Sequence, residues 1–186
     1  AAGDVDGDGV DEIIIAIDED DLIYIYEEYG ALRRKLVARF TPNDRLAAGD
    51  VDGDGEDEMI IAIDEDDLIY IYEEYGLKRK FPARFTPNDM LAVGDVDGDG
   101  ADEIVIAIDE DNKVYIYEEY GEVQEFPARF TKYGKLAAGD VDGDGKDEIL
   151  IAIDEDDKVW VYEEDGDWQW FDARFTKYDE LTAGVV

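Results

Sequence analysis

The chain alternates between short apolar runs and dense acidic segments, and this pattern recurs along its whole length. Runs rich in Ile and Val occupy residues 13–17, 59–63, 104–108 and 149–153. A short, continuous run of β-branched residues is typical of a strand that is buried on both faces. We therefore predict one buried strand in each copy of the pattern.

Three further extended segments accompany each buried strand. After a charged turn, residues 22–26 read LIYIY, whose β-branched and aromatic content favours a strand that forms a hairpin with the first. Residues 81–85, FPARF, predict an outer strand, and Pro82 and Pro127 place it at a sheet edge because proline cannot donate to a ladder. The small-residue segment 46–49 predicts a strand in a crowded place.

The copies recur at a nearly constant spacing. They begin at Gly3, Gly49, Gly94 and Gly139, with a partial copy at Gly184, so the spacings are 46, 45, 45 and 45 residues. One blade of a β-propeller has about this length and four strands. We predict an all-β fold, a β-propeller built of four-stranded antiparallel blades with four blades per chain.

The expected organisation is a single propeller unit over residues 1–186. The predicted blades are approximately residues 1–45, 46–90, 91–135 and 136–180, followed by an extra first-strand segment at 181–186. This extra strand is expected to overlap the N-terminal strand, seal the ring or dock on another chain. A four-blade ring from one chain and an eight-blade ring from two copies both remain open.

The repeats are unusually alike. Residues 49–93 and 94–138 share 30 of 45 aligned positions, which is typical of a recent duplication or an engineered consensus. The links at 33–35 and 78–80 are basic, whereas those at 122–125 and 167–170 are acidic or aromatic. We interpret this asymmetry as drift at exposed tips; the alternative is charge matching between two chains.

An acidic phrase, DVDGDGxDE, precedes every buried strand and begins at Asp4, Asp50, Asp95 and Asp140. Carboxylates at alternate positions of a tightly turning loop can converge on a hard cation, and calcium takes six to eight oxygen ligands. The seventh position varies among Val, Glu, Ala and Lys, as a backbone-carbonyl ligand would permit. The phrase thus predicts calcium, with a solvated acidic turn as the alternative.

The predicted ligands are the carboxylates at the first, third, fifth and ninth positions and the carbonyl at the seventh. They are Asp4, Asp6, Asp8, Val10 and Glu12; Asp50, Asp52, Asp54, Glu56 and Glu58; Asp95, Asp97, Asp99, Ala101 and Glu103; and Asp140, Asp142, Asp144, Lys146 and Glu148. The acids before each final Glu, which are Asp11, Asp57, Asp102 and Asp147, are alternative ligands that the sequence does not distinguish. About four calcium ions per chain are expected.

Other metals suit the phrase less well. Magnesium demands near-octahedral geometry and keeps several waters, whereas so many protein oxygens suit the larger calcium shell. Zinc lacks its usual nitrogen and sulfur ligands because the chain contains no His and no Cys.

The strand that follows the loop decides between families. EF-hands and dockerin modules continue into a helix, but here the continuation is extended. With LAAGDVDGDG at residues 136–145 and its three relatives, the chain resembles the FG-GAP and VCBS-like calcium propeller repeats of integrin alpha-subunit heads and secreted bacterial proteins. The resemblance implies calcium at the ligand positions given above. The ninth position is usually Asp in that family and is Glu here, and a missing Gly-Ala-Pro segment makes the VCBS-like branch the closer match.

The charge balance limits the partners. With 53 acidic and 17 basic residues, the net charge of −36 should destabilise a compact state, so we expect metal binding and folding to be coupled. Adaptation to high salt is the rival explanation. Nucleic acid is not expected because phosphate binding needs clustered Lys and Arg. We expect neither a membrane-spanning segment nor a signal peptide, and a calcium site of this kind favours an extracellular setting.

The chain lacks several of the residue types that catalytic sites commonly use. It contains no His, Cys or Ser, so we predict that the protein is not an enzyme but a calcium-binding scaffold with a structural or protein-interaction role. The alternative is a glycan-binding propeller domain of a secreted polysaccharide-active enzyme or adhesin. Trp168 and Trp170, on one face of an outer strand, would contact the sugar, and cross-strand packing is their competing explanation. Tyr24, Tyr70, Tyr115 and Trp160 are expected in the inter-blade core.

Overall fold

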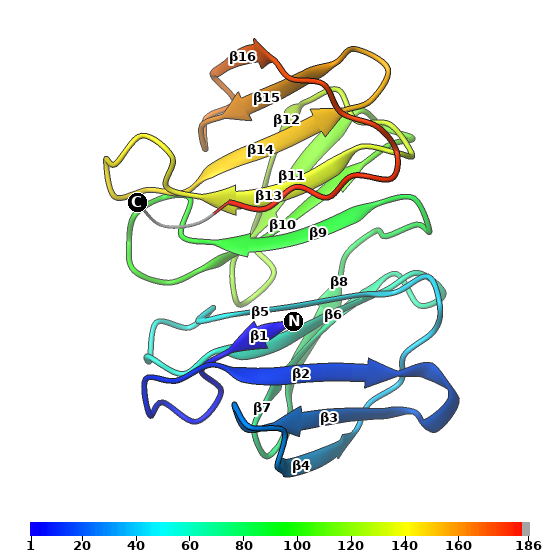
Figure 1. The fold of residues 1–186 in the computed structure, drawn as a ribbon, viewed down its shortest axis with the longest axis vertical. Helices are drawn as coiled ribbons and strands as arrows, with labels where there is room; N and C mark the ends of the chain where they lie inside the picture. Colours follow the sequence, from blue (N-terminus) through cyan, green and yellow to red (C-terminus); the bar gives the residue numbers. More distant parts are fainter. Residues whose placement is uncertain (184–186) are drawn as a thin grey trace. The chain divides into compact units, whose positions relative to one another are not determined.

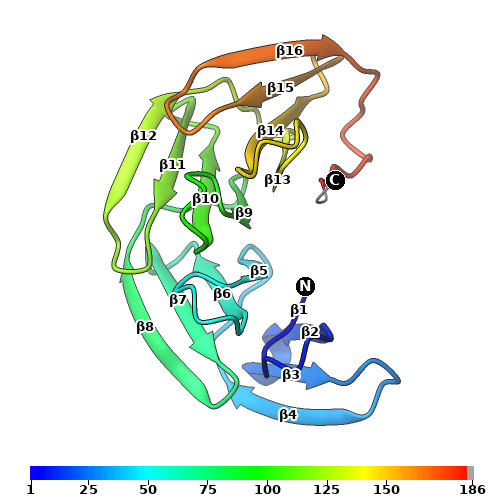
Figure 2. The same ribbon diagram turned by 90° about the vertical axis from the view of Figure 1, so that its left-hand side faces the viewer.

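The structure is a computed structural model that describes residues 1–183. It is all-β and divides into two compact units, Ala1–Pro87 and Asn88–Val186. Each unit holds two four-stranded sheets, and we call each sheet a blade, numbered in chain order (Figure 1). Within a blade the four antiparallel strands lie in chain order, from the first strand at one edge of the sheet to the fourth at the other edge, which we call the outer strand (Figure 2).

The strand bounds follow the repeat. Blade 1 comprises β1 (Ala2–Gly3), β2 (Glu12–Ile17), β3 (Leu22–Tyr26) and β4 (Leu32–Val37), and blade 2 comprises β5 (Arg45–Gly49), β6 (Glu58–Ile63), β7 (Leu68–Glu73) and β8 (Gly76–Pro82). Blade 3 comprises β9 (Met90–Gly94), β10 (Glu103–Ile108), β11 (Lys113–Tyr117) and β12 (Val123–Pro127), and blade 4 comprises β13 (Lys135–Gly139), β14 (Glu148–Ile153), β15 (Lys158–Tyr162) and β16 (Trp168–Asp172). The predicted fold class is confirmed, with one four-stranded blade per repeat.

The two blades of each unit pack face to face through the Ile-rich second strands. In the first unit, Met59, Ile61 and Ile63 of β6 contact the Ile14 side of blade 1, and all three are fully buried. In the second unit, the corresponding face of β14 packs on β10. The apolar runs therefore alternate between the two faces of a blade, because successive strand residues point in opposite directions.

The charged turn between the second and third strands has a fixed shape. In blade 1 it is a 3-10 turn, η1 (Asp18–Asp20), that ends at Asp21 with φ of 51°. Asp67, Asn112 and Asp157 repeat this left-handed conformation, which Asp and Asn tolerate better than most residues. The hydroxyl of Tyr24 donates to Asp20 at 2.7 Å. That bond explains why a tyrosine recurs there: it is half-buried at the edge of the core and ties the turn to the sheet.

Two predicted segments need correction. The sequence predicts the fourth strand at 81–85, but β8 spans Gly76–Pro82, because Phe81 already pairs with Ile69 and Pro82 ends the ladder. Its edge position is confirmed. The basic and acidic links therefore form the outer strands themselves and not only exposed tips.

The extra C-terminal strand is also wrong in the part that is described. Residues 181–183 do not form a strand. Leu181 and Ala183 pack instead on the apolar face of blade 4 that carries Leu150 and Val161. Residues 184–186, with the altered ligand position Val185, lie outside the described residues. Within residues 1–183 no helix is long and apolar enough to cross a membrane.

Candidate metal centre

Each acidic phrase forms the loop between the first and second strands of its blade, and we number loops 1 to 4 by blade: residues 4–12, 50–58, 95–103 and 140–148. The two glycines of loop 1, Gly7 and Gly9, have φ of 70° and 87°, values that favour glycine. The backbone then folds back on the first carboxylate: Gly9 N–H donates to Asp4 Oδ2 at 2.8 Å. Loops 2 to 4 repeat this bond, so the first carboxylate closes the turn in all four blades. Its other oxygen accepts the N–H of the fifth-position Asp in loops 1 and 2 and the N–H of the fourth-position Gly in loops 3 and 4.

The final Glu of each loop points inward. Glu12, Glu58, Glu103 and Glu148 are only 1 to 2 % exposed although they are charged residues. One oxygen of each carboxylate accepts the backbone N–H of the valine at the second loop position, for example Val96 N–H to Glu103 Oε2 at 2.8 Å. These bonds hold the start of each loop against the carboxylate of its final Glu. They use one oxygen of that carboxylate, so the second oxygen is available to another partner.

The Asp beside that Glu has a different role, which separates the two members of the pair. Asp57 Oδ2 accepts the backbone N–H of Asp4 in the preceding blade at 2.9 Å, and Asp57 N–H donates to the Asp4 carbonyl at 2.8 Å. Asp147 repeats the second bond with the Asp95 carbonyl at 2.8 Å. Asp57 and Asp147 therefore join neighbouring loops within a unit, and the Glu is the member that faces its own loop.

The structure brings predicted ligands together in every loop. Groups of carboxylate oxygens that lie within 4.8 Å of one another are Asp4, Asp6 and Asp8; Asp50, Asp52 and Glu58; Asp95, Asp97 and Asp99; Asp97, Glu103 and Glu118; and Asp140, Asp142 and Glu148. Glu12, Asp54 and Asp144 lie in the same loops but outside these groups. The seventh-position residues Val10, Glu56, Ala101 and Lys146 each donate their N–H to the fifth-position Asp.

Sequence reasoning missed one member of these groups. Glu118 follows β11 and lies with Asp97 and Glu103 over loop 3. The signal was present, because Glu27, Glu73 and Glu163 occupy the same position in the other repeats. Sequence alone could not show that the end of the third strand meets the metal loop.

The pKa values of several loop carboxyl groups are raised, which means that ionising all of them together costs free energy. Burial, together with the nearby Asp97 and Glu118, raises the pKa of Glu103 to about 8. Burial likewise raises the pKa of Glu58 to about 7, although the ammonium of Lys78 opposes the shift. The pKa of Glu118 is raised by burial and then by Asp97 and Asp99. A bound cation would relieve the repulsion.

Loop 4 supplies the observation that tests whether these residues fit a metal ion. Glu148 is 1 % exposed, and its Oε1 has no hydrogen-bond partner among the described residues. Buried carboxylate oxygens are rarely left without a partner because desolvation is costly. The oxygen belongs to a carboxylate grouped with Asp140 and Asp142, an all-oxygen donor set that suits calcium. The residues of loop 4 therefore fit the ion.

A pocket opens beside loop 4. It has a volume of about 300 Å³ and is lined by Asp144, Lys146, Glu163, Glu164, Asp165 and Asp167. It combines the fifth-position acid of the loop with the hairpin between β15 and β16. The surroundings of loop 4 are thus almost entirely acidic.

The aromatic residues of blade 4 form a separate cluster on the outer strand. The rings of Trp168 and Trp170 lie 5.0 and 6.4 Å from that of Trp160 on β15, and Lys158 Nζ lies 3.5 Å from the Trp170 ring centre. Cross-strand packing is thus present, yet Trp168 and Trp170 remain 56 and 45 % exposed. The cluster is both packed and accessible.

Comparison with known proteins supports the repeat and the fold. Residues 95–151, which include loops 3 and 4, match the model of the FG-GAP-like repeat. A search of curated proteins finds no match to the chain.

Several solved structures are similar in fold. BBS1N, solved in complex with ARL6DN, matches with a TM-score of 0.67 and 14% identity over 88% of this chain and 50% of its own. Virginiamycin B lyase from Staphylococcus aureus matches with a TM-score of 0.65 and 14% identity over 93% of this chain and 56% of its own. An Agrocybe aegerita lectin matches with a TM-score of 0.64 and 15% identity over 91% and 50%. The chain spans about half the length of these proteins, and at such identities the likeness shows the fold alone.

Proposed function

We propose that this protein is a calcium-binding β-propeller scaffold with a structural or protein-interaction role. The observation that carries the proposal is the unpartnered, buried Oε1 of Glu148 beside Asp140 and Asp142. The match of residues 95–151 to the FG-GAP-like repeat supports it. The bond from the second glycine to the first carboxylate recurs in all four loops, which extends the proposal from one loop to four.

In loop 4 the ion would be held by Asp140, Asp142, Asp144 and Glu148, with the carbonyl of Lys146. Calcium would supply positive charge where the chain places several carboxylates. The protein's own part is to preform the turn, since the Gly145 N–H already donates to Asp140 at 3.2 Å and the Val141 N–H to Glu148 at 2.8 Å. Binding to the folded state alone would add stability by mass action.

The test is thermal unfolding with calcium, with magnesium and with a chelator, followed by calorimetric titration of the chelated protein. We expect a clear rise of the unfolding midpoint in calcium and a smaller one in magnesium. Asp142→Asn should reduce the calcium-dependent rise, while Asp18→Asn, an exposed acid in the hairpin of blade 1, should not. Equal midpoints in all three conditions would exclude the proposal.

We propose that the role is not catalytic. The chain lacks His, Cys and Ser, and the remaining carboxylate groups recur in every repeat. An active site needs acid and base groups in distinct environments. An extracellular setting, where free calcium is abundant, is part of the same proposal.

Glycan binding is a second candidate, and the exposed Trp168 and Trp170 favour it. The Agrocybe aegerita lectin is described as specifically recognising non-reducing terminal N-acetylglucosamine, which makes this sugar a reasonable first probe. A glycan array on the wild type and on Trp168→Ala tests the idea. Binding that Trp168→Ala abolishes supports it, and an array without signal supports the scaffold instead.

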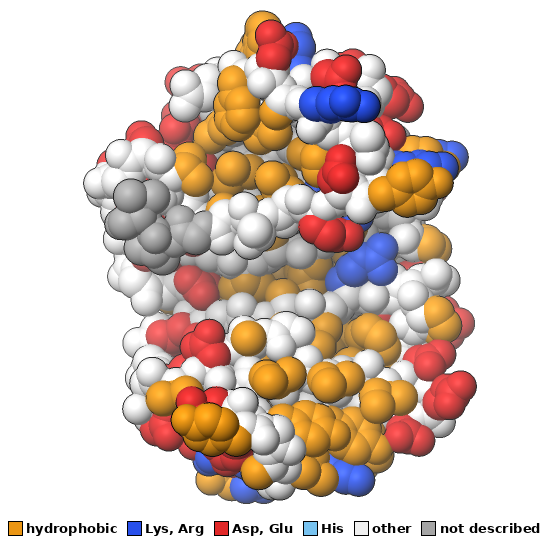
Figure 3. All heavy atoms as spheres, viewed as in Figure 1, with side chains coloured by type: hydrophobic (Ala, Val, Ile, Leu, Met, Phe, Trp, Pro, Cys, Tyr) orange, Lys and Arg blue, Asp and Glu red, His pale blue; other side chains and the backbone are white. Residues whose placement is uncertain are grey.

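A second copy of this chain is the macromolecular partner that we propose. Ile13 and Ile15 of β2 are each 44% exposed, whereas their equivalents on β6, Met59 and Ile61, are fully buried against blade 1. Figure 3 shows hydrophobic side chains exposed over the strands of blade 1. Light scattering in calcium should give the mass of a dimer, and Ile15→Glu should give a monomer. A monomeric wild type would refute the pairing.

A further inference from the structure

The four loops share their acidic residues but differ in the side chain that reaches them from the outer strand. In blades 1 and 2 the outer strand sends a basic side chain into the loop of its own blade, and in blades 3 and 4 it does not carry one at that position. The equivalent residues are Arg33, Lys78, Val123 and Trp168.

Lys78 lies among the predicted ligands of loop 2. Its ammonium donates to Asp52, to Glu58 Oε1 at 3.0 Å and to Glu73 Oε1 at 3.1 Å. The side chain is only 15 % exposed, and that of Glu58 is 2 % exposed. Three carboxylates of the loop and the adjoining strand therefore surround one nitrogen, and the pKa of Lys78 is raised by these partners against the effect of burial.

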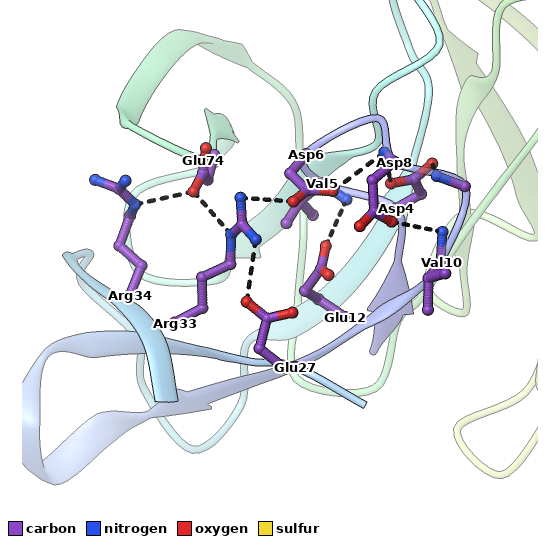
Figure 4. A network of polar contacts seen from close by, with 11 residues as sticks. Asp4, Val5, Asp6, Asp8, Val10, Glu12, Glu27, Arg33, Arg34 and Glu74 are labelled. Carbon is purple, nitrogen blue, oxygen red and sulfur yellow. Dashed lines mark hydrogen bonds and ion pairs between the residues drawn. The ribbon is translucent and has the colours of Figure 1, made fainter. Parts of the chain in front are cut away.

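Arg33 occupies the same place in blade 1. Its guanidinium contacts Asp6 Oδ2 at 2.6 Å and Glu27 Oε1 at 3.0 Å, while its Nε donates to Glu74 Oε1 of blade 2 at 2.9 Å (Figure 4). Asp6 is the third-position acid of loop 1, and Asp52 is its equivalent in loop 2. The two basic residues thus bind the same predicted ligand in successive blades.

A backbone irregularity aims these side chains at the loops. In blade 1, Ile25 pairs with Arg34 and Tyr26 pairs with Leu32, so Arg33 is skipped. In blade 2 the ladder skips Lys78 in the same way. A β-bulge re-directs the side chain of the extra residue, and bulges are common beside functional sites.

Blades 3 and 4 lack this arrangement in both sequence and register. Val123 pairs directly with Tyr117, and Trp168 pairs directly with Tyr162. The charged side chains that act most on the buried carboxyl of Glu103 are Asp97 and Glu118, and those that act most on Glu148 are Asp142 and Glu163, all of them acids. The unpartnered Oε1 of Glu148 lies in this second pair of loops, whereas the corresponding oxygen of Glu58 accepts from Lys78.

We propose that Arg33 and Lys78 are tethered cations that compete with calcium at loops 1 and 2, so that loops 3 and 4 bind the ion more tightly. The inference rests on the proposed calcium-binding function. A bound ion and the ammonium of Lys78 both need Asp52 and Glu58, and their like charges repel at such distances. Calcium therefore must displace the side chain before it binds loop 2. Loops 1 and 2 are held together by the chain's own charge, and loops 3 and 4 depend on the metal.

Calorimetric calcium titration of the full chain tests the proposal. The wild type should show two classes of site. The double variant Asp97→Asn, Asp142→Asn should lose the tight class, and Asp6→Asn, Asp52→Asn should keep it. Lys78→Val, which copies Val123, should raise the affinity of loop 2 about tenfold or more, the lower end of what charge-assisted hydrogen bonds contribute. It should also lower the unfolding midpoint in chelator.

The matched control is Lys80→Val, which removes the same charge from the same strand at a side chain that lies over the Tyr70 ring. Lys78→Gln, which keeps an amide donor, provides a milder variant if Lys78→Val folds poorly in chelator. Four equivalent sites in the wild type, or equal effects of Lys78→Val and Lys80→Val, would overturn the competition while leaving calcium binding intact. If calcium titration releases no heat and calcium leaves the unfolding midpoint of every variant unchanged, the calcium-binding function itself would be overturned.

Discussion

Glu103→Gln should change the stability of the protein in opposite directions with and without calcium. Glu103 is 1 % exposed and its pKa in the metal-free protein is about 8, mainly because of burial. The unfolded value is near 4.5. Between these two values the folded chain binds more protons than the unfolded one, so the free energy of unfolding falls as pH rises. Gln resembles the protonated carboxyl and removes this dependence.

The expected magnitude follows from the shift. Each pKa unit corresponds to about 1.4 kcal/mol, which sets a ceiling of about 5 kcal/mol for Glu103 above pH 8. Screening by solvent at the open side of the loop lowers this to about 2 to 3 kcal/mol. For a chain of this size, that difference would raise the unfolding midpoint of Glu103→Gln in chelator at pH 9 by about 5 to 10 °C. At pH 5 the variant and the wild type should be nearly equal.

Calcium should reverse the order of stability. The ion requires the ionised carboxylate, and an amide oxygen is a poorer ligand, so Glu103→Gln should gain less stability from calcium than the wild type. Scanning calorimetry at pH 5 and 9, in chelator and in calcium, measures all four states. Glu19→Gln, an exposed change in the blade 1 hairpin, is the control for net charge. A variant that is less stable than the wild type in chelator at pH 9 would refute the reasoning.

Three further predictions test how the blades are joined. Gly94→Ala should destabilise the second unit by about 1 to 3 kcal/mol in urea unfolding, because an added methyl would overlap both the Asp147 carboxylate and the Cβ of Ala138. Asp147→Ala should relieve only part of that loss, because the contact with Ala138 remains, and complete relief would contradict this packing. Asp44→Ala should cost about 1 to 3 kcal/mol, since Asp44 is 4% exposed and accepts the N–H groups of Thr41 at 2.7 Å and Asp64 at 3.1 Å; a loss below about 0.5 kcal/mol would show that water replaces it. Arg34→Ala should cost less than Arg33→Ala in chelator, because Arg34 contacts only Glu74 among the acids near loop 1, whereas Arg33 also holds Asp6; equal losses would contradict the assigned role of Arg33.

The regular part of this fold was predictable because every repeat states it again. The Ile-rich runs became β2, β6, β10 and β14, and the acidic phrase became the loop before each of them. The outer strand was misplaced because the alternation in FPARF continues beyond the point where backbone pairing stops. Side-chain periodicity reports which face is buried, and it does not report where a ladder ends.

The site was less predictable than the fold, because its details depend on contacts between strands. The preceding blade decides whether Glu58 or Asp57 faces loop 2. Its Asp4 N–H donates a hydrogen bond to the Asp57 carboxylate, so Asp57 turns away from loop 2 and Glu58 faces it. Glu118 reaches loop 3 from the end of β11, a contact that spacing along the chain does not reveal. The basic links, interpreted from sequence as drift, were the largest omission: two of their residues, Arg33 and Lys78, reach into the acidic loops.

The few positions where the near-identical repeats differ determine how the four acidic loops differ from one another, which the shared acidic phrase does not reveal. All four loops keep the same acids, so composition alone predicts four equal sites. One skipped residue in the outer strand changes this, because it turns a basic side chain toward Asp6 in blade 1 and toward Asp52 in blade 2. A tethered charge is always present at high local concentration, whereas a free ion depends on its supply. If Arg33 and Lys78 compete with calcium as proposed, the first unit should hold its loops at low calcium, and the stability of the second unit should follow the calcium concentration.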